Sequence, residues 1–158
     1  MSSLETTPQF LVCINASEES RIALKFACAL AVKRQGRVQL LHIVPPPQEF
    51  QGFLTVADKI RNENREAGEK LVAERAEEAQ KGSSITPVVS IREGKVADEI
   101  LAAAESDPDT DMVIIGADPD SGHGHIVSQL AAQLGKRLLI PLLIVPGNLT
   151  DQQIQALV

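Results

Sequence analysis

Residues 111–116 read Asp-Met-Val-Ile-Ile-Gly, and this stretch decides the fold of the chain. Met112–Ile115 is a continuous apolar run, rich in β-branched residues and stopped by Gly116, which is typical of a strand buried on both faces of a parallel sheet. Leu142–Val145 is a second run of this kind, set between two prolines. Ligands of open α/β sheets bind beyond the carboxyl ends of the strands. We therefore expect any binding site to involve the loop that follows Gly116.

Strands and helices alternate along the rest of the chain. The order predicts an α/β fold, a doubly wound and mainly parallel five-stranded sheet with helices on both faces. The whole chain, residues 1–158, is expected to form a single domain, with a loose arm at 1–8 and a tail at 148–158 that suits a short helix. Besides the two runs above and a short helical run between them, the predicted strands are 10–14, 38–44 and 88–91, and the predicted helices are 18–33, 56–80 and 96–104.

The two longest predicted helices differ in their apolar positions. The helix at 18–33 has a broad apolar face that includes Val32, and Ser17 is its predicted N-cap. The helix at 56–80 is strongly charged, and we expect it to cover the sheet while its outer face stays solvated. Its sparse apolar positions are Ile60, Ala67, Leu71 and Ala76.

Composition and charge exclude several classes of function. The chain has 158 residues, a net charge of −6 and no cluster of Lys and Arg, whereas a nucleic-acid surface needs a basic footprint. Aromatic residues make up 3% of the chain, with no Trp or Tyr, which removes base-stacking platforms. No apolar stretch reaches the length of a membrane span, and no signal-peptide pattern is found. We therefore expect a cytoplasmic protein with no nucleic-acid or membrane partner.

Two cysteines and one histidine fall in apolar segments. Cys13 lies in a predicted strand and Cys28 in a predicted helix. Because the chain has no Cys-x-x-Cys motif, both cysteines are predicted to be buried free thiols. His42 lies in a predicted strand, and we expect it to be a hydrogen-bonded core or strand-end histidine.

Five stretches together resemble the universal stress protein family, and they cover nearly the whole chain in matching order. The resemblance implies the doubly wound fold of adenine nucleotide alpha hydrolase-like proteins. It also implies a homodimer formed by antiparallel pairing of the edge strand Leu142–Val145 with its copy. The stretches are Leu11-Val-Cys-Ile-Asn-Ala-Ser-Glu-Glu-Ser20, Leu40-Leu-His-Ile-Val44, Glu93-Gly-Lys-Val-Ala97, Asp111-Met-Val-Ile-Ile-Gly116 and Ile140-Pro-Leu-Leu-Ile-Val145.

Many members of this family bind ATP through spaced glycines after the fourth strand, where small residues let backbone N–H groups approach phosphates. Gly116 matches the first glycine, but Pro119 occupies the second position and donates no N–H. The third position falls at Ser128 or Gln129, depending on a one-residue gap, so no glycine stands there. The nucleotide-binding candidates that the resemblance implies are Asn15, Ser17, Val44, Gly116, Gly122, Gly124 and Ser128.

Asn15 is a further departure from the family pattern. ATP-binding members commonly carry Asp at this position, and Asn lacks the charge that helps to hold magnesium. The loop looks rebuilt, although Gly122 and Gly124 still supply flexible backbone for a different anion or nucleotide. We therefore expect weak or no binding of ATP–Mg, with ATP or another adenine nucleotide left open as the ligand.

The same loop carries side chains of types that ligate metals. The candidates are Asp118, Asp120, His123 and His125, because carboxylates and neutral imidazoles bind divalent ions. The alternative is a solvated turn, since Asp-Pro-Asp-Ser-Gly is ordinary turn chemistry and His-x-His directs two rings to opposite sides of an extended segment. No spacing here is diagnostic of a metal site, so we expect no bound metal.

Known catalytic motifs are absent from the sequence. Neither Gly-x-Ser-x-Gly nor the phosphate-binding pattern Gly-x4-Gly-Lys-Ser/Thr occurs, and no cysteine has an activating context. The sequence therefore favours a non-catalytic, cytoplasmic stress-response or regulatory protein. The alternative is an ATP- or AMP-binding switch with slow hydrolysis, and the glycine spacing after Gly116 favours the non-catalytic protein.

Overall fold

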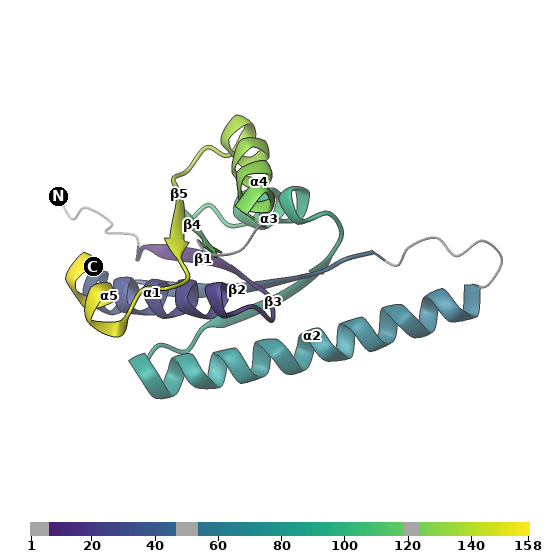
Figure 1. Cartoon of the computed structure of the whole chain (residues 1–158), viewed down its shortest axis with the longest axis horizontal. Helices are drawn as coiled ribbons and strands as arrows, with labels where there is room; N and C mark the ends of the chain where they lie inside the picture. Colours follow the sequence, from purple (N-terminus) through teal and green to yellow (C-terminus); the bar gives the residue numbers. More distant parts are fainter. Residues whose placement is uncertain (1–6, 47–53, 119–123) are drawn as a thin grey trace.

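The computed structural model describes residues 7–46, 54–118 and 124–158, in which strands and helices alternate (Figure 1). The five predicted strands are all present, and each overlaps its predicted range. The strands are β1 (Gln9–Ile14), β2 (Arg37–Val44), β3 (Val88–Glu93), β4 (Thr110–Ala117) and β5 (Leu142–Pro146). The helices are α1 (Glu18–Arg34), α2 (Leu54–Ser83), α3 (Val96–Ser106), α4 (Gly124–Arg137) and α5 (Asp151–Leu157).

The sheet is parallel throughout and has the order β3-β2-β1-β4-β5, which confirms the predicted doubly wound fold. From β1 the chain moves outward through β2 to β3, and it then returns to β4 on the other side of β1. The strand order therefore reverses between β1 and β4. Their carboxyl ends form the switch point at which α/β proteins bind ligands. β3 and β5 are the edges of the sheet, so the predicted edge position of Leu142–Val145 is confirmed.

Helices cover both faces of the sheet (Figure 1). α1, α2 and α5 pack on one face, and α3 and α4 pack on the other. Successive residues of a buried strand alternate between the two cores, so that Leu40 of β2 faces the first core and Leu41 the second. The helices contribute Ile22, Val72 and Ile154 to the first core and Ile100 and Leu134 to the second.

α1 begins as predicted and ends differently. Ser17 is its N-cap and accepts a hydrogen bond from the Ser20 amide, while two glutamates in the first turn suit the positive end of the helix dipole. At the other end, the predicted apolar face is wrong for Val32, which is 54% exposed. The last buried side chain of α1 is Ala31. Val32 lies outside the narrower stripe that contacts the sheet.

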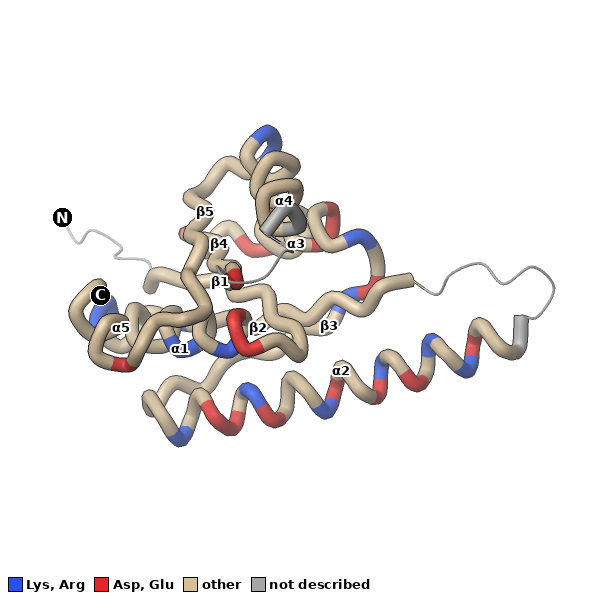
Figure 2. Tube along the Cα trace, in the orientation of Figure 1, with Lys and Arg blue, Asp and Glu red and all other residues tan. Residues whose placement is uncertain are grey.

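α2 is a long charged helix whose amino-terminal part extends beyond the other helices (Figures 1 and 2). Acidic and basic residues alternate along it (Figure 2), and nearly all of them are exposed, which confirms the predicted solvated outer face. Of the predicted apolar positions, Ile60, Leu71 and Ala76 are half-buried, whereas the prediction is wrong for Ala67, which is exposed. The fully buried positions are Gly68, Val72 and Ala79, and because two of these are glycine and alanine, the contact stripe has little apolar signal.

The first turn of α1 lies against glycines from two other elements. A Cβ atom at Gly116, near the end of β4, would overlap the Glu19 carbonyl group and lie 3.0 Å from the Ser20 amide nitrogen. A Cβ atom at Gly147, just after β5, would lie 2.5 Å from the Glu19 Cβ. The Gly147 amide also donates to the Ala117 carbonyl oxygen at 2.7 Å. These glycines therefore let the amino end of α1 enter the carboxyl edge of the sheet.

We predict that Gly116→Ala lowers the free energy of unfolding by at least about 2 kcal/mol, because the added methyl group meets backbone that cannot move independently. Gly135→Ala is the matched control, since a Cβ at this position of α4 meets nothing within 4 Å. The control should keep or raise stability by up to about 1 kcal/mol through helix propensity. Urea denaturation measures both. Equal stability of the two variants would contradict the close contact between α1 and β4.

Candidate functional site

The switch point brings several of the predicted site residues to one edge of the sheet. Asn15 and Ser17 follow β1, Gly116 ends the buried part of β4, and Val44 ends β2. Neighbouring strands are in parallel register, with Val12 paired to Ile114 and Ile14 paired to His42, so their carboxyl ends meet. The sequence therefore places the backbone groups of these residues around a shared region at the carboxyl edge.

The turn from β1 into α1 is held by a compact set of hydrogen bonds. The Asn15 Oδ1 accepts from the Ser17 amide at 2.8 Å and from the Ser17 hydroxyl group. The hydroxyl group of Ser20, which is buried, accepts from the Asn15 amide at 3.2 Å and donates to the Asn15 carbonyl oxygen at 2.8 Å. Asn15 is itself exposed. The side-chain oxygen of Asn15 therefore shapes the turn. The NH2 group of the same side chain has no hydrogen-bond partner among the described residues and can meet a ligand.

The end of β2 is organised by contacts from α2 and β3. The Val44 side chain is buried, and its carbonyl oxygen accepts from the Gly94 amide at 3.1 Å. Next to Gly94, Glu93 forms an ion pair with Arg61 of α2, with an N–O distance of 3.0 Å. The carbonyl of Val44 is thus already hydrogen-bonded, and its parallel pairing with Glu93 engages its amide in the sheet as well. The predicted contribution of Val44 to a nucleotide site is therefore reduced to its position at the edge.

Packing alone explains why position 116 is a glycine, without any ligand. The Glu19 carbonyl occupies the space that a side chain at position 116 would need. The resemblance assigned this glycine to close approach by phosphates, whereas in the structure the group that approaches closely is the backbone of α1. Its contribution to ligand binding stays a prediction.

The structure describes only part of the loop after β4. Asp120, Gly122 and His123 lie outside the described residues, as does the side chain of His125. Gly124 is the first residue of α4, and Ser128 is an exposed residue one turn further along. The helix after the loop therefore begins with a glycine, which lies one turn before the position at which the family pattern has its third glycine.

Metal-ligating side chains do not cluster in the part of the chain that the structure describes. Asp118 is half-buried at the end of β4. No group of three or more His, Cys, Asp or Glu side chains suited to a metal ion occurs among residues 7–46, 54–118 and 127–158. The other predicted metal ligands fall outside this part, so the metal candidates stay a prediction.

Both cysteines are free, as predicted. Burial raises the pKa of the Cys13 thiol to about 12. Burial also raises the pKa of the Cys28 thiol, although a hydrogen bond with Ser83 acts in the opposite direction. Because the thiolate is the nucleophile, both groups are unreactive neutral thiols near neutral pH. His42 is half-buried, and its Nδ1 lies 2.9 Å from the Ile14 carbonyl oxygen, which confirms the predicted hydrogen-bonded strand-end histidine.

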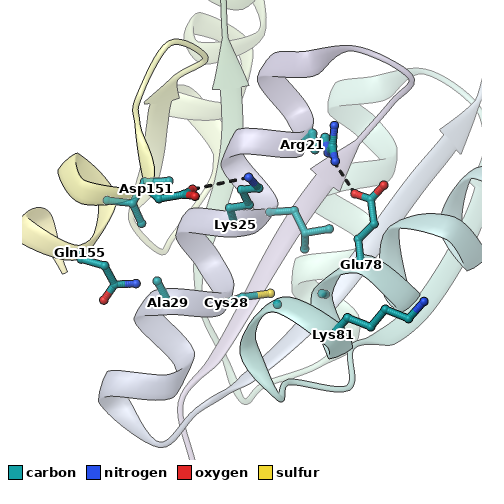
Figure 3. Close-up of a pocket in the computed structure, with 12 residues that line it drawn as sticks. Arg21, Lys25, Cys28, Ala29, Glu78, Lys81, Asp151 and Gln155 are labelled. Carbon is teal, nitrogen blue, oxygen red and sulfur yellow. Dashed lines mark hydrogen bonds and ion pairs between the residues drawn. The ribbon is translucent and has the colours of Figure 1, made fainter.

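A hollow lies away from the switch point, between α1, α2 and α5 (Figure 3). Its volume is about 580 Å³. Leu24, Cys28, Ala79 and Ile154 form much of its apolar lining. Ion pairs from α1 to its neighbours stand at its rim: Arg21 with Glu78 at 3.0 Å and Lys25 with Asp151 at 3.5 Å. The groove was not predicted from the sequence because residues of three separate helices line it. The one local sequence signal for the groove is the run of small side chains on α1.

The strand order and the switch point define an α/β protein with a nucleotide-binding-like fold. The chain belongs to the universal stress protein family, whose sequence model matches residues 7–146. No curated protein sequence matches the chain. In the described residues, no helix is both long enough and apolar enough to cross a membrane.

Solved structures of universal stress proteins share this fold. UspA from Lactobacillus plantarum is 16% identical at a TM-score of 0.75, with 87% of this chain and 97% of that chain covered. A family member from Burkholderia pseudomallei is 17% identical at a TM-score of 0.71, with 90% and 98% covered. The universal stress protein from Archaeoglobus fulgidus in complex with dAMP is 13% identical at a TM-score of 0.63, with 88% and 97% covered.

Proposed function

We propose that this protein is a non-catalytic, cytoplasmic stress-response regulator that binds an adenine mononucleotide at the carboxyl edge of β1, β2 and β4. The observation that carries the proposal is the Asn15–Ser20 turn at the switch point, which is held by its own hydrogen bonds and leaves Asn15 exposed. The dAMP complex of the Archaeoglobus fulgidus protein supports this ligand class. The buried neutral thiols and the absence of catalytic motifs from the sequence support a non-catalytic function.

Charges at the two nearby helix ends indicate where a phosphate group would lie. α1 carries Glu18 and Glu19 in its first turn, and these carboxylates repel an anion. α4 has no acidic residue in its first turn and opens with Gly124. Free N–H groups and the helix dipole make such an amino end favourable for an anion. We infer that the phosphate lies at α4 and the nucleoside lies nearer to Asn15 and Val44.

Weak binding of ATP–Mg follows from the chemistry of the β1 end. Asn15 is neutral, and its Oδ1 already accepts from the Ser17 amide at 2.8 Å. Magnesium prefers charged oxygen ligands in strict octahedral geometry. A triphosphate would therefore bring charge and a hydrated ion to a strand end where position 15 supplies a neutral amide in place of a carboxylate, whereas a mononucleotide brings neither.

The second candidate is an ATP-binding switch with slow hydrolysis. Gly124 favours it, because a glycine at the start of α4 allows backbone N–H groups to approach a longer phosphate chain closely. The two candidates differ in their response to magnesium and phosphate number.

We predict that dAMP binds at least about tenfold more tightly than ATP–Mg, a difference of about 1.4 kcal/mol. Asn15→Asp should narrow the difference by restoring a carboxylate for magnesium. Gln133→Glu is the matched control, because it adds the same charge at an exposed position of α4 one turn from its carboxyl end. Isothermal titration calorimetry measures all three proteins. Tighter binding of ATP–Mg than of dAMP to the wild type would favour the switch, and no binding of either nucleotide would contradict both candidates.

We also infer that β5 mediates a homodimer. β5 is an open edge, and Ile144 is 41% exposed on it, while the nearby Leu139 is 98% exposed. An apolar edge left open promotes aggregation, so it needs a partner. Pairing of the edge with its own copy across a two-fold axis buries both side chains, which supports antiparallel pairing of Leu142–Val145.

We predict that Ile144→Lys converts the dimer to a folded monomer, because the lysine side chain disfavours apolar pairing while Ile144 is too exposed to be needed for the core. Gln155→Lys is the control, since it adds the same charge on the exposed face of α5. Light scattering combined with circular dichroism gives mass and fold. A wild-type monomer at tens of micromolar, a concentration at which most obligate dimers persist, would refute the β5 dimer.

A further inference from the structure

His42 is the one polar side chain from the later half of β2 on the face covered by α1 and α2. Its neighbours on the same face of the strand are Leu40 and Val44, both buried. A half-buried imidazole at this position requires hydrogen-bonding partners. The partner of Nδ1 is the Ile14 carbonyl oxygen at 2.9 Å. A carbonyl oxygen only accepts, so Nδ1 is the donor and carries a proton.

This hydrogen bond acts on the peptide group that leads into the site. The Ile14 carbonyl and the Asn15 amide belong to the same planar peptide unit. His42 donates to its carbonyl side at 2.9 Å, and the Ser20 hydroxyl accepts from its amide side at 3.2 Å. Both ends of the unit are therefore fixed, which sets the direction in which the chain enters the Asn15–Ser17 turn.

The imidazole ring is in turn held by the backbone of α2. A Cβ atom at Gly68 would lie 2.8 Å from the His42 Cδ2 and 3.2 Å from its Nε2. Gly68 is in the interior of α2, where glycine is otherwise unfavourable. The close approach of helix and ring explains the glycine. α2 thus packs against the edge of the His42 ring that faces away from Ile14.

We propose that His42 is a positioning residue for the nucleotide site: packed between Gly68 and β1, it orients the Ile14–Asn15 peptide and thereby the Asn15 side chain, whose NH2 group meets the ligand. This inference rests on the proposed function for its ligand, but the contact between His42 and the turn is a property of the free protein. Because Gly68 of α2 holds the His42 ring, the position of α2 also affects how tightly the site binds its ligand.

The test uses the full chain and separates the ring from the donor. His42→Phe keeps the ring and removes the donor, whereas His42→Asn keeps a donor in place of Nδ1 and removes the ring. Gln39→Leu is the matched control, because Gln39 is also half-buried on β2 but hydrogen-bonds Gln9 at the opposite end of the sheet, at 3.0 Å. The readouts are dAMP affinity by calorimetry and amide hydrogen exchange of residues 15–20 relative to residues 113–115.

We expect His42→Phe to weaken dAMP binding by about tenfold and to speed exchange in the turn by about tenfold relative to β4, as expected for loss of one partly buried hydrogen bond. His42→Asn should recover most of both effects, and Gln39→Leu should change neither. Gly68→Ala provides a second route if the His42 variants fail to fold, since the added methyl displaces the ring while favouring the helix. It should loosen the turn and weaken binding in the same direction.

Unchanged turn exchange in His42→Phe, or in Gly68→Ala where the former does not fold, would overturn the proposal. So would a looser turn with unchanged dAMP affinity. If the wild-type protein binds no dAMP, the proposed function fails by itself, and the exchange measurement still decides whether His42 orients the turn.

Discussion

The first turn of α1 lies directly against Gly116 of β4 and Gly147 after β5, and the rest of the carboxyl edge depends on this contact. Any side chain at Gly116 would overlap the Glu19 carbonyl group. Because α1 enters so deeply, its N-cap Ser17 and the preceding Asn15 stand at the point where the strand order reverses. The same contact ties β1, β4 and β5 together. A packing requirement between backbone groups therefore creates the site geometry.

Hydrogen bonds and helix ends then give this edge its chemical character. The turn from Asn15 to Ser20 satisfies its own polar groups and is clamped from β2 by His42. The acidic first turn of α1 and the acid-free first turn of α4 divide the edge into a side that repels anions and a side that attracts them. Such an edge suits a ligand with one phosphate and a neutral ring system. The groove between α1, α2 and α5 lies on the face of the sheet, away from these groups.

The sequence predicts most of the fold because its strands are short apolar runs with clear boundaries. Val113, Ile114 and Ile115 are buried in β4, and Ser17 caps α1 as its residue type and position indicate. The contact stripe of α2 was not predictable from apolar periodicity, since one of its contact residues is Gly68. The packing of Gly116 against Glu19 was also not predictable, because a sequence does not show which group lies opposite a glycine. The partner of His42 depends on strand register in the same way.

Chemical-shift mapping of the protein titrated with dAMP tests the account most directly, because it locates the ligand without assuming a binding mode. If the nucleotide binds at the carboxyl edge of the sheet, the largest shifts should occur at the amides of Asn15, Ser17, Val44, Gly116 and Gly124. Shifts that concentrate instead on Leu24, Cys28 and Ile154, in the groove between α1, α2 and α5, would contradict it.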